Sequence, residues 1–166
     1  MPRSSIARVL AGLAAALPAF LGSGPPLLAQ APSMTFYLQI SPQGGGRCAE
    51  PADRQAGEGK TLQMQDCNNS PARIFTYDPA NMRLMIGGLC VDAGDGQGGT
   101  LVKLASCNGR ENQAWRIERK SEFAKLVGIK GLCLDIRYGS RDAGAPLQVW
   151  DCGDAEPNQL WRFSRQ

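Results

Sequence analysis

The chain has 166 residues, and 18 basic side chains against 15 acidic ones give it a formal net charge of +3. Because binding to nucleic-acid phosphates depends on clustered Lys and Arg, this balance does not favour nucleic acid as a partner. The chain has no histidine, which removes the commonest general base and excludes Ser-His and Cys-His nucleophile systems. Without histidine or a C-x-x-C pair, we expect neither a metal site nor a cofactor.

Residues 1–29 have the layout of a secretory signal peptide. Basic residues precede an apolar run over 9–21, and small residues follow up to Ala31. We place the cleavage after Ala29, with the bond after Ala31 as the alternative, so that a short segment over 30–35 begins the mature chain. A retained anchor is disfavoured because the apolar run is shorter than the roughly 20 residues that span a bilayer. We therefore expect a secreted protein, extracellular or periplasmic, without stable membrane insertion.

Residues 36–166 are predicted to form one domain made of a threefold repeat. The units run over about 36–79, 80–120 and 121–166, and each has two cysteines followed by a segment that ends in an aromatic residue. Six cysteines in an exported chain indicate three disulfides, for which about 15 connectivities exist in principle. The repeat favours pairing within each unit: Cys48 with Cys67, Cys90 with Cys107, and Cys133 with Cys152.

Each unit contains short apolar runs separated by Gly, Asn, Asp and Pro clusters, which is typical of short strands and turns. No window after the leader keeps a helical apolar period. The second unit is predicted to have strands over 82–86, 89–92, 100–107 and 113–117, and the third over 124–129, 132–136, 147–152 and 159–163. Three units of about 42 residues with about four strands each predict an all-β barrel with pseudo-threefold symmetry, a β-trefoil.

Two units share a pair of signatures in register with their cysteines. They are the strands Cys90-Val91-Asp92 and Cys133-Leu134-Asp135, followed by Gln113-Ala114-Trp115 and Gln159-Leu160-Trp161. The C-[LV]-D and Gln-x-Trp motifs resemble the ricin-B-type lectin family over essentially the whole mature chain. The resemblance implies a carbohydrate-binding β-trefoil with the Gln-x-Trp tryptophans in its core. The first unit has Cys48-Ala49-Glu50 and Arg73-Ile74-Phe75 instead, so we expect it to keep a core aromatic and to be inactive in binding.

A pyranose presents hydroxyls and one apolar ring face, so its site needs hydrogen-bonding side chains beside an aromatic platform. By its resemblance to the family's sugar-binding repeats, the third unit has this set. Asp135 would accept from two hydroxyls, Trp150 would stack on the ring, and Asn158 would hold one of the same hydroxyls. Gln148 and Gln159 would orient Asp135 or reach the ligand.

Trp150 distinguishes the third unit from the other two. Its counterparts are Gln65 and Ala105, so the core does not require an aromatic side chain at this position. A ligand contact is therefore favoured over the alternative of an exposed packing residue. The polar turn over 139–146 is expected to form the rim of the site, with Tyr138 as a second aromatic wall.

The second unit keeps Asp92, Asn112 and Gln113 as a possible weak second site. However, Lys103 stands where the third unit has Gln148, and Ala105 stands where it has Trp150. With no platform, we expect weak or absent sugar binding there.

The leading hypothesis is a secreted, non-catalytic lectin module whose partners are glycans, with galactose-type sugars implied by the resemblance. An alternative is a β-trefoil that binds or inhibits another protein and keeps a vestigial sugar site. A glycoside hydrolase would need two carboxylates about 5 to 9 Å apart, for which Asp135 and Asp151 are the candidates. Because Asp151 follows Trp150 along a predicted strand, it should point to the opposite face. We therefore expect no catalytic residue, and the sequence leaves the oligomeric state open.

Overall fold

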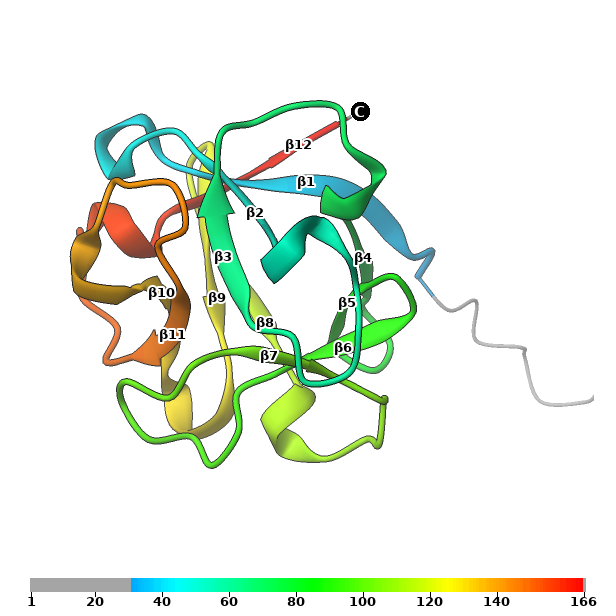
Figure 1. Cartoon of the computed structure of the whole chain (residues 1–166). Coiled ribbons are helices and arrows are strands. Elements are labelled where there is room, and N and C mark those ends of the chain that lie inside the picture. Colours follow the sequence, from blue (N-terminus) through cyan, green and yellow to red (C-terminus); the bar gives the residue numbers. More distant parts are fainter. Residues whose placement is uncertain (1–30, 166) are drawn as a thin grey trace, which may run out of the picture.

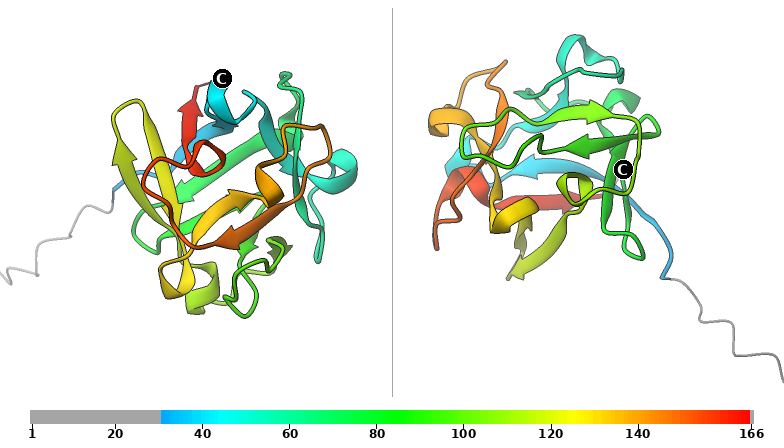
Figure 2. Two further views of the ribbon diagram at one scale, coloured as in Figure 1. Left: turned by 90° about the vertical axis from the view of Figure 1, so that its left-hand side faces the viewer. Right: turned by 90° about the horizontal axis from the view of Figure 1, so that it is seen from below.

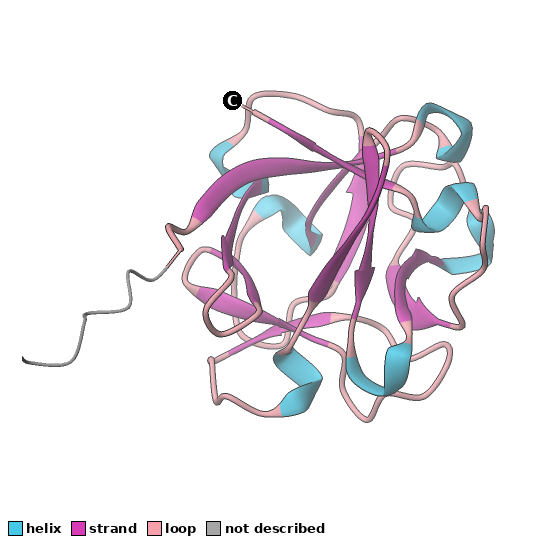
Figure 3. Ribbon diagram, turned by 180° about the vertical axis from the view of Figure 1, so that it is seen from behind, coloured by secondary structure: helices cyan, strands magenta, loops and turns pink. Residues whose placement is uncertain are grey.

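The computed structural model describes residues 31–165, so the predicted signal peptide and its preferred cleavage bond lie outside the described residues. Within this range the chain forms short strands and 3₁₀ turns and no α-helix (Figure 3). None of the helical segments in residues 31–165 is long and apolar enough to cross a bilayer. The strands are β1 (Met34–Ile40), β2 (Cys48–Pro51), β3 (Leu62–Gln65), β4 (Ile74–Asp78), β5 (Arg83–Ile86), β6 (Leu89–Asp92), β7 (Lys103–Ala105), β8 (Arg116–Lys120), β9 (Phe123–Val127), β10 (Cys133–Ile136), β11 (Leu147–Trp150) and β12 (Trp161–Ser164).

Six strands form a barrel in which every pairing is antiparallel. Strand β1 pairs with β4 and β12, β4 pairs with β5, and β9 pairs with β8 and β12. An isolated bridge between Arg83 and Ala114 joins β5 to the segment that leads into β8. The ring of strands encloses the interior of the molecule in all three views (Figures 1 and 2).

The other six strands form three hairpins, one in each repeat: β2–β3, β6–β7 and β10–β11. Backbone hydrogen bonds join these hairpins to one another in a triangle. They run from Leu62 N to Val102 O at 3.1 Å, from Val102 N to Leu147 O at 3.0 Å, and from Met64 N to Ala145 O at 2.8 Å. Equivalent positions of the three repeats thus meet around one pseudo-threefold axis, and the predicted β-trefoil is confirmed.

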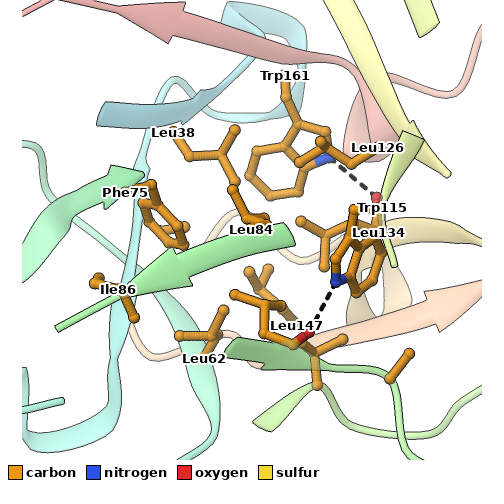
Figure 4. Close-up of a cluster of buried hydrophobic side chains, with 14 of the residues drawn as sticks. Leu38, Leu62, Phe75, Leu84, Ile86, Trp115, Leu126, Leu134, Leu147 and Trp161 are labelled. Atoms are coloured by element: carbon orange, nitrogen blue, oxygen red, sulfur yellow. Dashed lines mark hydrogen bonds between the residues drawn. The ribbon is translucent and has the colours of Figure 1, made fainter. Parts of the chain in front are cut away.

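The three repeat aromatics lie in the centre of the core, as the threefold pattern predicts. Phe75, Trp115 and Trp161 are fully buried among aliphatic side chains that come from every repeat (Figure 4). The indole N–H of Trp115 donates to the Val91 carbonyl at 2.8 Å, and that of Trp161 donates to the Leu134 carbonyl at 3.0 Å. Burial of each such ring stabilises the fold by roughly 1.5–3 kcal/mol, and the indole bonds satisfy the one polar group that this burial would otherwise leave unpaired.

The three predicted disulfides are present, each within one repeat. The Cα atoms are 5.0 Å apart in Cys48–Cys67, 5.1 Å in Cys90–Cys107 and 5.1 Å in Cys133–Cys152. Each bond ties the first strand of a hairpin to the chain just after the second strand. Loops of this length stabilise the fold by roughly 3 kcal/mol each in the chain-entropy model.

The last strands of the second and third repeats begin later than predicted. Residues Glu111–Gln113 and Pro157–Gln159 form 3₁₀ turns, so β8 begins at Arg116 and β12 begins at Trp161. Pro157 favours a turn because its ring fixes φ near the helical value and removes a strand donor. Both Gln-x-Trp glutamines therefore lie in turns. From there the Gln113 side chain reaches Asp92 and the Gln159 side chain reaches Asp135, each on the hairpin of its own repeat.

Candidate functional site

The site predicted in the third repeat lies on the β10–β11 hairpin, drawn in orange in Figures 1 and 2. In this hairpin Asp135 is paired with Gln148, and Cys133 is paired with Trp150. Residues two apart on a strand point to the same face, and so do directly paired residues. The register therefore places Asp135, Gln148 and Trp150 on one face of the hairpin.

The Asp135 carboxylate is held by three side-chain amides. Only 2% of the residue is exposed. Gln148 Nε2 donates to its Oδ1 at 2.9 Å, Gln159 Nε2 donates to its Oδ2 at 2.9 Å, and Asn158 Nδ2 also donates to Oδ2. A carboxylate has about four acceptor positions, so these amides occupy most of them and leave one on Oδ1.

Gln159 is bonded to Asp135 and to the backbone beside it. Besides its bond to Asp135, its Nε2 donates to the Asp151 carbonyl at 2.9 Å, and its Oε1 accepts from Gly153 N at 3.0 Å. The residue is buried, and the bonds to the backbone on either side of Cys152 fix the amide in one orientation. Asn158 is only partly buried, which leaves its amide nearer to the open side of the site.

Burial raises the pKa of Asp135 above its ordinary value of 3.8. The bonds from Gln159, Gln148 and Asn158 stabilise the ionised form and act against this rise, whereas the nearby Glu156 carboxylate adds to it. The site therefore combines a desolvated negative charge with amide donors that compensate only part of the desolvation cost.

Trp150 is an exposed aromatic side chain at the end of strand β11, with 48% of its surface accessible. Its six-membered ring lies against the backbone of Gly98 in the loop between β6 and β7, where an added Cβ would be 3.3 Å from Cε3 and 3.5 Å from Cζ3. The loop comes from the second repeat, so a neighbouring repeat supports one side of the ring. The remaining exposed surface is available for stacking.

Asp135, Gln148, Trp150, Asn158 and Gln159 all line one cleft of about 920 Å³. Tyr138 stands on its rim with 87% of its surface exposed, and the Arg137 guanidinium lies 5.0 Å from its ring centre. The other lining residues are Gln97, Gly98, Gly99, Thr100, Arg137, Gly139, Asp151, Cys152, Gly153 and Glu156.

The strand alternation that predicts Asp151 on the face opposite Trp150 does not extend to this residue. Strand β11 ends at Trp150, so the alternation of a strand no longer applies to the next residue, and Asp151 lines the cleft. Within residues 31–165 no group of three or more His, Cys, Asp or Glu side chains is arranged to hold a metal ion.

In the second repeat, the carboxylate is held in a similar way but the platform is missing. Asn112 Nδ2 donates to Asp92 Oδ1 at 2.7 Å and Gln113 Nε2 donates to Asp92 Oδ2 at 2.9 Å. The backbone N–H of Gly94 takes a further position on Oδ1 at 2.7 Å. Because Ala105 stands where the third repeat has Trp150, the Asp92 carboxylate and its amide partners have no aromatic side chain beside them.

The first repeat fills the equivalent position with a buried ion pair. Arg73 donates through Nε and Nη2 to Glu50 Oε2, both at 2.8 Å, and both side chains are buried. Arg73 also donates to the Asp66 carbonyl, which is the counterpart of the Asp151 carbonyl bonded by Gln159. Arg73 therefore takes over the structural role of the Gln-x-Trp glutamine and closes the Glu50 carboxylate to solvent.

Sequence reasoning missed the contribution of the second repeat to this cleft. The loop residues Gln97–Thr100 line it, as do Arg137 and Glu156 of the third repeat. The run of glycines in residues 94–99 was a usable signal, because glycine in a loop often marks a close approach of the backbone to another group.

The family model described as the ricin-type beta-trefoil lectin domain matches residues 36–161. Nigrin b of Sambucus nigra is 38% identical over 63 residues, 37% of this chain and 11% of that protein. Beta-galactoside-specific lectin 2 of Viscum album is 40% identical over 42 residues, 25% of this chain and 7% of that protein. The matched segments are thus a small part of these much longer relatives.

Two solved structures share the fold at low sequence identity. The designed threefold-symmetric protein ThreeFoil aligns with a TM-score of 0.73 and 20% identity, covering 80% of this chain and 99% of that one. The C-terminal half of the earthworm R-type lectin, solved with GalNAc, aligns with a TM-score of 0.65 and 15% identity over 80% of this chain and 98% of that one. Because the family model spans most of the chain, the protein belongs to the ricin-type β-trefoil lectin domain family.

Proposed function

We propose that the protein is a secreted, non-catalytic lectin module with one principal site for galactose-type sugars in the third repeat. The observation that carries the proposal is the Asp135 carboxylate, held by three amides beside the half-exposed Trp150 in an open cleft. Relatives named as beta-galactoside-specific lectins and a structural neighbour solved with GalNAc support the choice of sugar.

The ligand would be held by hydrogen bonds on one side and by an aromatic ring on the other. The free acceptor position of Asp135 would take one sugar hydroxyl in a charge-assisted bond. The partly exposed amide of Asn158 would bind an adjacent hydroxyl, since an amide both donates and accepts. The apolar face of the pyranose would stack on Trp150, which offers a large contact area at a small cost in conformational entropy.

Binding to galactosides by the purified protein tests this proposal. We expect methyl galactoside to bind weakly, and Trp150→Ala to weaken binding at least about 10-fold, as expected for loss of an aromatic anchor. Met82→Ala is the matched control, because Met82 is an apolar side chain of similar exposure, 45% against 48%, outside the cleft. An unchanged affinity in Trp150→Ala would reject the site.

The same variants separate the lectin from the alternatives. A protein-binding or inhibitor module would keep its partner after Trp150→Ala, whereas a lectin keeps its fold and loses its glycan. Since Asp151 and Glu156 also line the cleft, the absence of catalysis is tested directly. We expect no release of reducing sugar from β-galactosides or polysaccharides, and release that disappears in Asp135→Asn would overturn the non-catalytic proposal.

A further inference from the structure

The cleft at Trp150 is formed by two repeats rather than one. On one side it is lined by Arg137, Tyr138 and Gly139 of the third repeat, and on the other by the Gln97–Thr100 segment of the second. Figure 1 shows this segment as the green loop between β6 and β7, beside the orange strand β11.

The second-repeat loop is fixed against the third repeat by its backbone. Gly99 N donates to the Val149 carbonyl at 2.8 Å, and Val149 N donates to the Thr100 carbonyl at 3.0 Å. Lys130 Nζ donates to the Asp95 carbonyl at 2.9 Å. Two of these bonds are made by Val149, the residue before Trp150, so the loop is held in place along this side of the cleft.

Glycine allows a close approach at two positions. A Cβ on Gly96 would lie 2.5 Å from Ile129 Cγ2, and the residue has φ +63°, which strains other side chains. Gly98 brings its backbone onto the Trp150 ring, as described above. Two glycines of this loop, Gly96 and Gly98, thus lie where its backbone comes closest to the third repeat.

The corresponding loop of the first repeat meets the second repeat through the same pair of backbone bonds, from Gly59 N to Leu104 O at 2.7 Å and from Leu104 N to Lys60 O at 2.8 Å, but its side chains are arranged differently. There Glu58 Oε2 accepts from the backbone N–H of Ser106 at 2.8 Å and from its hydroxyl at 2.9 Å. A side chain thus occupies the junction between the first and second repeats. At the junction with the third repeat, Gln97 is exposed and lines the open cleft.

The cleft extends past Asp135 and Trp150 to the Gln97–Thr100 segment of the second repeat. Its volume is about 920 Å³, and a single pyranose held by Asp135 and Trp150 would leave the part along this segment open. We propose that the site takes at least a disaccharide, with one pyranose held by Asp135 and Trp150 and a second unit bound along Gln97–Thr100 by the Gln97 amide. This inference rests on the proposed function.

The test compares methyl β-galactoside with a set of galactose-terminated disaccharides that differ in linkage, by calorimetric titration of the full protein. We expect at least one disaccharide to bind about 3- to 10-fold more tightly than the monosaccharide, the range that one net hydrogen bond supplies. Gln97→Ala should remove this gain and leave the monosaccharide affinity within about twofold. Gln55→Ala is the matched control, because Gln55 is an exposed glutamine in the equivalent loop of the first repeat.

Two results overturn the inference and are distinguishable from each other. If methyl β-galactoside binds but no disaccharide binds more tightly, or if Gln97→Ala leaves the disaccharide gain intact, the second-repeat wall is not a subsite, and the proposed function stands. If the wild-type protein binds none of these galactosides, the proposed function itself fails, and the inference fails with it.

Discussion

The first and third repeats use the same position of the trefoil for a buried carboxylate, and they surround it in opposite ways. In the first repeat, Glu50 faces the guanidinium of Arg73 and is closed to solvent. In the third, Asp135 faces neutral amides at the bottom of a cleft. All three repeats place a partnered carboxylate between the hairpin and the turn that follows it. The cation of the first repeat closes its carboxylate to solvent, whereas the amides of the third leave Asp135 at the bottom of an open cleft.

The largest expected effect comes from breaking the ion pair of the first repeat. Arg73→Gln removes the buried cation of this pair and leaves Glu50 with only the exposed Arg54, whose Nε lies 3.7 Å from Oε1. We expect a cost of about 3–5 kcal/mol in free energy of unfolding. Chemical denaturation measures this loss. The double variant Glu50→Asp/Arg73→Gln recreates the pair of the second and third repeats and should recover much of the stability. A single variant as stable as the wild type would show that the pair is not structural.

The equivalent change in the third repeat should affect binding instead of folding. Asp135→Asn removes a charge-assisted acceptor, worth about 1.5–3 kcal/mol of binding or roughly 10- to 150-fold in galactoside affinity. Its free energy of unfolding should change by less than that of Arg73→Gln, because the partners of Asp135 are neutral. If Asp135→Asn lost much stability and little galactoside affinity, the carboxylate of the third repeat would be structural, like that of the first, and not a binding group.

A change in the loop that supports Trp150 should have an intermediate effect. Even the Cβ of a residue at position 98 would lie 3.3 Å from the Trp150 ring, so the two further methyl groups of Gly98→Val would crowd the ring. The ring must move, so we expect galactoside affinity to fall several-fold and the tryptophan emission to shift. Gly57→Val, in the equivalent loop of the first repeat and outside the cleft, is the control, and equal effects of the two variants would contradict the supporting role.

The raised pKa of Asp135 predicts opposite pH dependences for binding and stability. As the pH falls through this pKa, the folded carboxyl takes up a proton before the unfolded one does, whose ordinary value is 3.8. This group's contribution to stability is therefore present below 3.8 and is lost as the pH rises through the higher folded-state pKa. Galactoside affinity, which needs the ionised form, should fall on acidification above pH 3.8. Titrations at several pH values check this, and Asp135→Asn should abolish the dependence.

The smallest effect concerns charge on the ligand. The cleft is lined by three acidic residues, Asp135, Asp151 and Glu156, and by one basic residue, Arg137. Tyr138 also lines it. Exposed charge pairs contribute about 0.2–1 kcal/mol, so a carboxylated galactoside should bind up to about fivefold more weakly than its neutral parent. The difference should shrink at high salt, and tighter binding of the acidic ligand would contradict it.

Much of the fold was predictable because the same sequence pattern occurs three times in the chain. The cysteine pairs and the aromatic that follows each pair recur at nearly constant spacing, so the disulfides and the core positions of Phe75, Trp115 and Trp161 follow from alignment of the repeats. The boundaries of β8 and β12 were not predictable in this way. The 3₁₀ turns at Glu111–Gln113 and Pro157–Gln159 depend on side-chain bonds to a different strand.

The candidate site could be predicted only in part, for the same reason. Asp135 and Trp150 could be chosen because the third repeat differs from the others at the position of Trp150. The pairing of Glu50 with Arg73 was not foreseen, although both residues replace the family motif in the same repeat. A pair of matched departures from a repeat is a signal that such partners compensate each other.

The threefold fold, its disulfides and the choice of the third repeat for the candidate site follow from the order and spacing of residues within each unit. Three features needed the folded chain: the bond of Gln159 to Asp135, the closure of Glu50 by Arg73, and the contact of a glycine-rich loop of the second repeat with Trp150. These are contacts between turns and hairpins distant in sequence. Their geometry is set by how the three repeats meet around their axis, which no single repeat encodes.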